Sequence, residues 1–367
     1  MNIILIFTYG ISLKNWQESG LLDRELLIYN KLIDKYKINY TFITFGDKSD
    51  LNLVNNKKIK IIPIYSYIKK SNNKYFNILK TFLIPFYIRK ELKNTSLIKT
   101  NQLNGSWVGI IFKYLLKVPL IIRTGYNLYE FTLNEKKPLL LKFFHKYITY
   151  LSLNLSDIYI VTSKSDKDFL EKSFKFKKEI LIIPNWVQEV QTLKYSKRFP
   201  NKIISVGRME KQKNFKNLVD VLSNSLYKID IYGEGSEISN LKKIANQNIS
   251  FKGKLKHSEL IKQYKYYKVF ITTSLFEGNP KSVLEAMASG CVVLAKDNKN
   301  IREIVKHKVN GYLFNSDTEL LKILDEIMYD ELIFEKVSKN AIETIQNNNN
   351  LNNILKIEIE LYNLLIK

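Results

Sequence analysis

The sequence predicts an α/β protein with two domains, each built on an open and mostly parallel sheet. The chain has 367 residues, more than one hydrophobic core usually serves. Hydrophobic residues make up 45% of it and charged residues 25%, a composition typical of folded globular proteins. Short apolar runs alternate with longer amphipathic stretches, as expected when covering helices join parallel strands.

The N-terminal domain is expected to span residues 1–185 and to form one doubly wound unit. Its predicted strands are 3–8, 40–44, 59–64, 97–100, 119–123, 158–162 and 180–183. Helix-like segments separate several of them, at 21–35, 105–116 and 138–153. We expect this unit to provide the acceptor side of any site that the two domains share.

The polar stretch 186–200 interrupts the apolar rhythm and is interpreted as an interdomain linker. A second domain, 201–345, is predicted to have strands at 202–206, 229–232, 249–251, 269–272 and 291–295. Two similar open sheets facing each other would leave a cleft outside the carboxyl ends of their strands. The tail, 318–367, predicts two helices broken by an Asn-rich run, and the last one, within 346–367, is expected to lie between the domains.

Composition limits the cellular context and the chemistry. Cys291 is the only cysteine, which excludes an internal disulfide and a Cys-rich zinc site and suits a reducing cytoplasm. The apolar run at the start is too short for a signal peptide, and no stretch approaches the ~20 apolar residues that span a bilayer. The net charge of +23 favours anionic partners such as phosphate-bearing substrates, anionic lipid or nucleic acid. The alternative is a solvated basic surface that reflects biased composition.

The motif with the most chemical content runs from Phe276 to Gly290, directly after a predicted strand. Pro280 suits the first turn of a helix, which would then end at Gly290. Such a helix start directs backbone N–H groups and the positive end of the helix dipole at the sheet edge, where a diphosphate fits. The carboxylates of Glu277 and Glu285 could accept hydrogen bonds from sugar and ribose hydroxyls. The alternative is an ordinary helix with two unrelated glutamates.

A second motif follows the strand 202–206 and contains Gly207, Arg208 and Lys213. A guanidinium and an ammonium that converge on one cleft would neutralise phosphate oxygens without a metal. The alternative is a pair of solvated loop residues. Weaker signals are Gly233, in a Gly-Glu-Gly turn after another strand, and Gly20, which could let a helix N-terminus approach phosphate; either can also be a plain turn residue.

From about residue 156 to 313 the chain resembles the retaining glycosyltransferases of family 4, which have the GT-B architecture of two facing Rossmann-like domains. The motifs Gly207-Arg208 with Lys213, Gly233-Glu234-Gly235, and Glu277 with Glu285 agree with that family in order and spacing. Segments 156–163 and 182–185 resemble the end of its N-terminal domain.

The resemblance implies a glycosyltransferase that moves a sugar from a nucleotide-diphosphate sugar, with retention and without a metal or other cofactor. It implies catalytic roles for Arg208, Lys213 and Glu277, with Glu285 on the ribose. The implied donor-binding residues further include Gly20, Gly207, Gly233, Gly278, Asn279, Pro280, Lys281 and Ser282. Retention in this family is attributed to front-face attack, in which the leaving phosphate oxygen takes the proton of the acceptor.

Three departures from the family pattern concern the site. Asn214 stands where glycine is common, and Asn279 where an aromatic residue often follows the glycine. The strand 119–122 continues into Arg123 and Tyr126 rather than into the histidine that many members carry, so we expect these two residues on the acceptor side. The histidines present elsewhere in the chain are expected to be structural or exposed.

The segment 65–92 mixes lysines and arginine with aromatic residues. Such a segment could lie on an anionic membrane surface and meet a lipid-linked acceptor or a surface-polysaccharide precursor. This predicts a cytoplasmic protein peripheral to the inner face of the membrane. The alternative is a helix packed by its aromatic residues, with solvated lysines.

Two other functions remain open from the sequence. A nucleotide-sugar epimerase on the same architecture would share a phosphate cleft but would need acid and base residues of its own. A basic nucleic-acid-binding protein would explain the charge, but no recognisable binding motif is present. We therefore expect no specific nucleic-acid partner.

Overall fold

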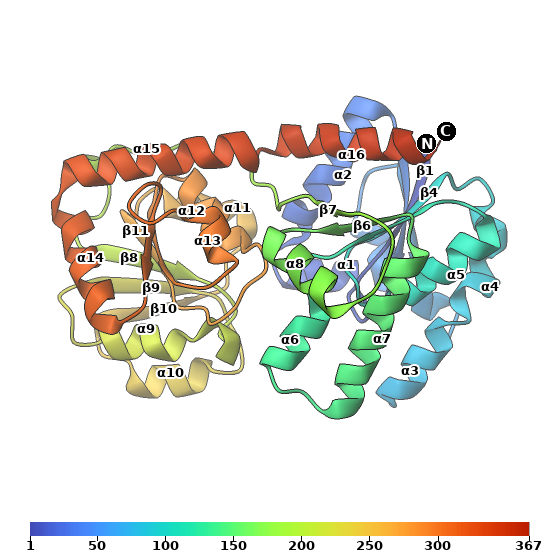
Figure 1. Cartoon of the computed structure of the whole chain (residues 1–367), viewed down its shortest axis with the longest axis horizontal. Coiled ribbons are helices and arrows are strands. Elements are labelled where there is room, and N and C mark those ends of the chain that lie inside the picture. The colour runs from blue at the N-terminus through green and yellow to red at the C-terminus, as the bar shows by residue number, and fades with distance from the viewer. Residues whose placement is uncertain (367) are drawn as a thin grey trace. The chain divides into compact units, whose positions relative to one another are not determined.

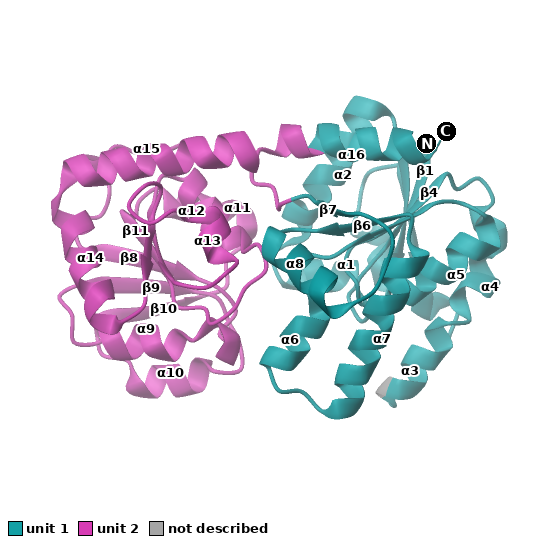
Figure 2. Cartoon of the chain, in the orientation of Figure 1, with its two compact units in different colours: residues 1–183, 355–367 teal, residues 184–354 magenta. Residues whose placement is uncertain are grey.

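The computed structural model describes residues 1–366, except for the side chain of Lys74. The chain divides into two compact units, which Figure 2 distinguishes by colour. The first contains residues 1–183 and returns at 355–367, and the second contains residues 184–354; Lys367 lies outside the described residues. Each unit has one parallel sheet with helices packed on it (Figure 1). The predicted fold class, two Rossmann-like α/β domains, is confirmed.

The first unit has a seven-stranded sheet in the order β3-β2-β1-β4-β5-β6-β7. Its strands are β1 Asn2–Ile6, β2 Asn39–Thr44, β3 Ile59–Pro63, β4 Leu97–Thr100, β5 Leu120–Arg123, β6 Ile158–Val161 and β7 Ile180–Ile182. Its helices are α1 Leu13–Glu18, α2 Leu22–Tyr36, α3 Lys74–Thr81, α4 Ile84–Ile88, α5 Ser106–Leu116, α6 Leu128–Asn134, α7 Leu139–Leu155 and α8 Lys164–Ser173. All its neighbouring strands pair in parallel, as in a doubly wound sheet.

The second unit has a six-stranded sheet in the order β10-β9-β8-β11-β12-β13. Its strands are β8 Lys202–Val206, β9 Lys228–Tyr232, β10 Ile249–Gly253, β11 Val269–Thr272, β12 Val292–Lys296 and β13 Tyr312–Phe314. Its helices are α9 Phe215–Leu222, α10 Ile238–Ile244, α11 His257–Tyr264, α12 Lys281–Ala288, α13 Ile301–Ile304, α14 Asp317–Tyr329 and α15 Glu331–Asn348. Strand β13 is missing from the sequence prediction.

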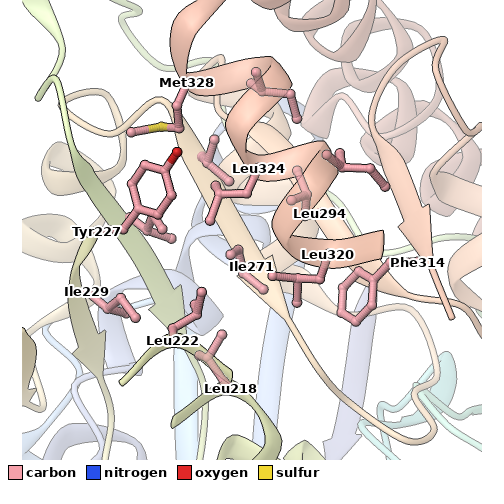
Figure 3. Packing of buried hydrophobic residues seen from close by; sticks show 14 of the residues in the cluster. Leu218, Leu222, Tyr227, Ile229, Ile271, Leu294, Phe314, Leu320, Leu324 and Met328 are labelled. Atoms are coloured by element: carbon pink, nitrogen blue, oxygen red, sulfur yellow. The ribbon is translucent and has the colours of Figure 1, made fainter. Parts of the chain in front are cut away.

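One face of the second sheet packs against α9 and α14. Leu218 and Leu222 of α9 and Leu320 and Leu324 of α14 meet strand residues such as Ile271 (Figure 3). All five side chains are fully buried. Burial of a side chain of this kind stabilises a fold by about 1.5–3 kcal/mol, so this core holds the sheet edge described below in a fixed shape.

The polar stretch predicted as a linker, 186–200, belongs to the second unit. Val187 is buried and bridges to Asn350. The guanidinium of Arg198 is also buried and donates to the carbonyl oxygens of Leu193, Tyr267 and Ser289. This buried arginine, with its three backbone acceptors, therefore holds the polar stretch against the second unit.

The tail has three helices rather than the predicted two. Asp330 ends α14 and its carboxylate caps α15 by accepting from the N–H of Ile333, a cap that divides one apolar pattern into two helices. The last helix, α16 Leu351–Leu365, begins in the second unit and continues in the first. It buries one stripe, Leu351, Ile354, Leu355, Glu358 and Tyr362. None of the helices in the described residues is long and apolar enough to span a membrane.

Candidate functional site

The order of the second sheet reverses beside β8. The chain builds β8, β9 and β10 toward one edge and then returns to place β11, β12 and β13 on the other side of β8. Loops that follow β8 and β11 therefore leave the sheet in opposite directions, and open α/β sheets bind ligands at such a point. The motifs singled out from the sequence follow these two strands.

The loop after β8 turns into a short 3-10 helix, Lys211–Lys213, and then into α9. Asn214 joins the two with a left-handed backbone, φ 50°, which Asn adopts more readily than most other non-glycine residues. This explains how Asn replaces the glycine common at that position. Arg208 is exposed in this loop, while the neighbouring Met209 is fully buried and anchors it.

The loops after β8 and β11 are tied together by hydrogen bonds. Leu275 donates its N–H to the Gln212 carbonyl, 2.9 Å, and the Gln212 side chain donates to the Phe276 carbonyl, 2.7 Å. The Thr273 hydroxyl donates to the carbonyl oxygens of Lys213 and Asn214. These contacts fix Lys213 and Glu277 relative to each other before any ligand contact.

Lys213 and Glu277, 64 residues apart in sequence, form an ion pair with 2.5 Å between Nζ and Oε1. The Glu277 side chain is 8% exposed and that of Lys213 is 16% exposed. An ammonium has three donors and a carboxylate has about four acceptor positions, so each group can still bind a ligand atom while the pair is intact. The pair thus brings a positive and a negative charge to one point.

Glu285 lies in the second turn of α12 and is 5% exposed. Its Oε1 is 2.8 Å from Nε2 of His257, the first residue of α11. The expectation that the histidines are structural or exposed is not contradicted by His257, whose mostly buried ring contacts a predicted site residue. It fits His145, where burial lowers the pKa to about 4 and Nδ1 is 2.5 Å from the Thr132 hydroxyl.

Helix α12 begins as predicted, with Pro280 at its N-cap and a left-handed Gly290, φ 73°, after its end. The backbone of Gly278 is buried, and Ser282 is half-buried in the first turn. The Lys281 ammonium lies 5.0 Å from the centre of the Trp186 ring, an attraction that orients it. The helix start is thus present where the sequence predicted it.

Asn279 is used in packing. Its Oδ1 accepts from the N–H of Asn185, 2.9 Å, and its carbonyl accepts from the Asn185 side chain, 2.6 Å. Asn349 in turn donates to the Asn185 carbonyl, 2.7 Å. The residue that departs from the family pattern therefore fastens the loop before α12 to the start of the second unit.

The Gly-Glu-Gly turn after β9 owes its glycines to close backbone packing. Gly233 has φ 135°, and a Cβ there would overlap the carbonyl oxygen of Gly207. A Cβ at Gly235 would overlap the Met209 backbone. The amides of Gly207 and Gly233 donate to the carbonyls of Tyr232 and Gly253, at 3.0 and 2.8 Å. The turn therefore packs directly against the backbone of the loop that contains Arg208.

The remaining predicted residues lie in the first unit. Gly20 follows α1, not β1, and has φ 68°; the turn directly after β1 contains Gly10 instead. Arg123 ends β5, its N–H donates to the Thr100 hydroxyl at 3.2 Å, and its charge acts on the buried Glu358. The Tyr126 ring packs on Phe131, 4.7 Å between ring centres.

Sequence reasoning missed three residues that shape the site: His257, Gln212 and Asn185. Each contacts a residue of the motif that runs from Phe276 to Gly290, across a gap of 28 residues or more. The position of His257 at a helix start after a strand was the only available signal. Within the described part of the chain, no group of three or more His, Cys, Asp or Glu side chains is arranged to hold a metal ion.

Comparison with known proteins identifies the second unit. Residues 190–344 match the model of the family described as glycosyl transferases group 1. The match to glycosyl transferases group 1 covers most of the second unit. The matched span contains the loops after β8 and β11, the Lys213–Glu277 pair and the His257–Glu285 pair.

The similarity to individual relatives covers different shares of the chain. An uncharacterized glycosyltransferase of Haemophilus influenzae is 24% identical and covers 90% of this chain and 92% of its own length. The GtfA subunit of the UDP-N-acetylglucosamine–peptide N-acetylglucosaminyltransferase of Streptococcus pneumoniae is 26% identical over 52% of this chain and 40% of that relative. Alpha-monoglucosyldiacylglycerol synthase of Streptococcus pneumoniae is 24% identical over 72% of this chain and 64% of that relative.

The fold of the whole chain is that of GT-B proteins. The crystal structure of HepE from Anabaena in complex with UDP and glucose superposes with a TM-score of 0.76, covering 100% of both chains at 15% identity. At this identity the likeness concerns the fold. It extends the GT-B description from the second unit to the first unit.

Proposed function

We propose that this protein is a glycosyltransferase that moves a sugar from a nucleotide-diphosphate sugar to an acceptor, with retention and without a metal. The observation that carries the proposal is the pairing of Lys213 with Glu277 at the β8–β11 edge, within the span that matches glycosyl transferases group 1. A cation and a carboxylate held together there fit a ligand whose phosphate and sugar are neighbours. A uridine nucleotide is the first donor to test, since the name of one relative and the complex of one structural neighbour contain UDP.

The chemistry requires stabilisation of two charges. When the bond from the anomeric carbon to the diphosphate oxygen breaks, its electron pair stays on that oxygen and positive charge builds on the carbon. Arg208, Lys213 and the N-terminal end of α12 supply positive potential to the departing oxygen. The acceptor hydroxyl then bonds to the same face of the carbon, and its proton passes to the leaving oxygen. No protein nucleophile is needed.

Glu277 and Glu285 divide the donor between them in this proposal. Glu277 accepts from hydroxyls of the transferred sugar, and the backbone from Gly278 to Ser282 lies beside that sugar. Glu285, held by His257, accepts from the ribose hydroxyls. The contacts that support this division are the ion pair to Lys213 and the buried hydrogen bond to His257.

We propose the first unit for the acceptor, with Arg123 and Tyr126 as candidate contacts. The acceptor class we propose is a lipid-linked or surface-polysaccharide precursor, met by a cytoplasmic enzyme at the inner face of the membrane. A relative named for diacylglycerol glycosylation supports a lipid acceptor.

Thermal melting with a panel of nucleoside diphosphates tests the donor assignment. A ligand that binds the native state raises its stability, so one base should raise the melting temperature more than the others at equal concentration. Excess chelator should not change this shift or the transfer rate. A panel without effect, or activity abolished by chelator, would contradict the proposal.

Two substitutions test the division of roles. Arg208→Ala should lower kcat by about a hundredfold, since losing one preorganised donor to a developing charge costs about 3 kcal/mol. Glu285→Ala should mainly raise the KM for the donor. If both variants transferred sugar as well as the wild type, the site assignment would be wrong.

A further inference from the structure

The first unit exposes aromatic and aliphatic side chains on two of its helical segments. In the segment α3–α4 they are Tyr75, Phe76, Leu79, Phe82, Leu83, Phe86 and Tyr87, with exposed fractions from 37% to 80%. The alternative of a helix packed by its aromatic residues is therefore wrong for this segment. Within α3, Leu79 stands four residues after Tyr75 and three after Phe76, so these three side chains share one face of the helix.

A second stripe lies on α7 and was not expected from the sequence. Leu139, Leu140, Phe143, Tyr147 and Tyr150 are 69%, 85%, 67%, 62% and 45% exposed. The opposite face of the same helix buries His145, Ile148, Thr149 and Ser152. The outer face of α7 thus carries large apolar side chains, which is unusual for a helix that meets only water.

Trp107 of α5 joins the two stripes. Its ring stacks on Phe82 at 5.9 Å between ring centres and meets Phe144 of α7 edge-on at 5.9 Å. Its Nε1 donates to the Thr81 hydroxyl, 2.9 Å. Helix α5 packs against both α4 and α7, and α3 and α7 extend from the first unit in the same direction (Figure 1). The two stripes therefore form one surface, which we call the α3–α7 surface.

The surroundings of the α3–α7 surface are strongly basic. Residues 67–93 and 133–150 contain eleven lysines and arginines but only two acidic residues, Glu91 and Glu135. Both glutamates already pair with lysines, Glu91 with Lys60 at 2.8 Å and Glu135 with Lys137 at 3.2 Å. Lys146 is exposed between Phe143 and Tyr147.

We propose that the α3–α7 surface docks on an anionic lipid bilayer, with the apolar stripes at the headgroup boundary and the lysines among the phosphates. Exposed Leu, Phe and Tyr beside Lys and Arg are the residues that place a helix at this boundary. A second copy of the chain is a poor partner for this surface, because a self-complementary contact would bring the lysines and arginines around both surfaces together. An anionic bilayer instead places negative phosphates opposite these lysines and arginines. The proposal does not rest on the donor site, which lies in the second unit.

Co-sedimentation with vesicles tests the proposal. The protein should bind vesicles of equal parts phosphatidylglycerol and phosphatidylcholine at low salt, and should bind pure phosphatidylcholine vesicles much less. Added salt should weaken the binding, since the lysine–phosphate attraction is screened. Replacing Lys142 and Lys146 by Gln should lower the affinity for the anionic vesicles about fivefold per charge, the equivalent of about 1 kcal/mol each.

Substitutions of exposed apolar residues separate this surface from a general charge effect. Leu140→Glu with Phe143→Glu in α7, and Leu79→Glu in α3, should each reduce vesicle binding by about tenfold or more. Leu226→Glu is the matched control, because Leu226 is 88% exposed but lies in the second unit, and it should bind as the wild type does. All variants should keep the wild-type melting temperature and its shift by nucleoside diphosphate.

Three outcomes would overturn the proposal. One is no binding to anionic vesicles at low salt. Another is undiminished binding by both the α3 and the α7 variants. The third is unchanged vesicle binding by those variants together with a smaller particle than the wild type on gel filtration. That result would show that the surface is a contact between copies of the chain. Each of these results can be interpreted even if the proposed donor site fails its own test.

Discussion

Glu285 shows at the scale of single residues how a site depends on a partner that the sequence does not point to. Its carboxylate is almost fully buried, and the His257 ring lies 2.8 Å from it. A buried carboxylate needs such a partner to keep a fixed orientation. His257 therefore positions the group for which we propose ribose binding.

Replacing His257 by Ala should raise the Kd for the preferred nucleoside diphosphate by about tenfold, the range expected when a hydrogen bond to a charged group is lost. Isothermal calorimetry measures this directly. Binding of inorganic pyrophosphate, which has no ribose, should change much less. The control is His307→Ala, an exposed histidine of the same unit. Equal weakening of both ligands would indicate a general structural defect instead.

Gly233 shows a second residue-scale effect, in which a missing side chain determines the loop. Gly233→Ala should destabilise the second unit by about 3 kcal/mol or more, because steric overlap with Gly207 adds to backbone strain. Gly253→Ala is the matched control. It also has a positive φ, 67°, but its Cβ would meet open space, so it should cost only about 1–2 kcal/mol. Urea unfolding curves compare the two; equal costs would argue against the close approach of the two loops.

At the scale of elements, α16 is fastened to the first sheet by a buried ion pair. Lys99 of β4 and Glu358 of α16 are 3% and 2% exposed, with 2.5 Å between Nζ and Oε2. The Tyr362 hydroxyl accepts a further hydrogen bond from Lys99 at 3.3 Å. Burial pushes the pKa of Glu358 up, but Lys99, the Tyr362 hydroxyl and the charge of Arg123 together hold it below its ordinary value.

Glu358→Gln should destabilise the first unit by about 3–5 kcal/mol, since it leaves the Lys99 charge buried without its partner. Glu360→Gln, on the exposed side of the same helix, should be near neutral. Chemical denaturation at neutral pH measures both. A Lys99→Met, Glu358→Met double variant should recover most of the loss, and failure to do so would mean that the tyrosine and arginine contacts dominate.

The same pair predicts a pH dependence. Because the pKa of Glu358 is lower in the folded than in the unfolded protein, its contribution is complete above the unfolded value and is lost as the pH falls through the folded value. The stability difference between wild type and Glu358→Gln should therefore shrink below about pH 4. Denaturation curves at several pH values measure it; a constant difference would contradict the assignment.

At the scale of the whole molecule, the two units each have their own sheet, and the chain crosses between the units at 183–184 and again within α16. Each unit packs buried hydrophobic side chains around its own sheet, so each unit can unfold in a cooperative transition of its own. The proposed donor site belongs to the second unit and the Lys99–Glu358 pair to the first.

Calorimetry should therefore resolve two unfolding transitions. The preferred nucleoside diphosphate should raise only the transition of the second unit, because a ligand stabilises the unit that binds it. Glu358→Gln should lower only the other transition. A single transition that both changes shift equally would show that the two units unfold as one.

The sequence by itself determined the two α/β units and the motifs at the carboxyl ends of β8 and β11. Strand runs such as 202–206 and 269–272 are mostly apolar and largely buried, and the Pro280 and Gly290 that bound α12 act within a few residues of themselves. Local backbone preferences and hydrophobic periodicity are properties of short segments, so they can be recognised without the fold.

Only the tertiary structure decided which residues meet. Lys213 with Glu277, His257 with Glu285, Lys99 with Glu358 and Asn185 with Asn279 each join segments that are 28 to 259 residues apart. Partner choice between distant polar groups depends on how the sheet brings loops to one edge, and no pattern within a segment encodes it. The sequence did not reveal the exposed apolar stripe of α7 for the same reason. An apolar residue gives the same sequence pattern whether it faces the core or the solvent.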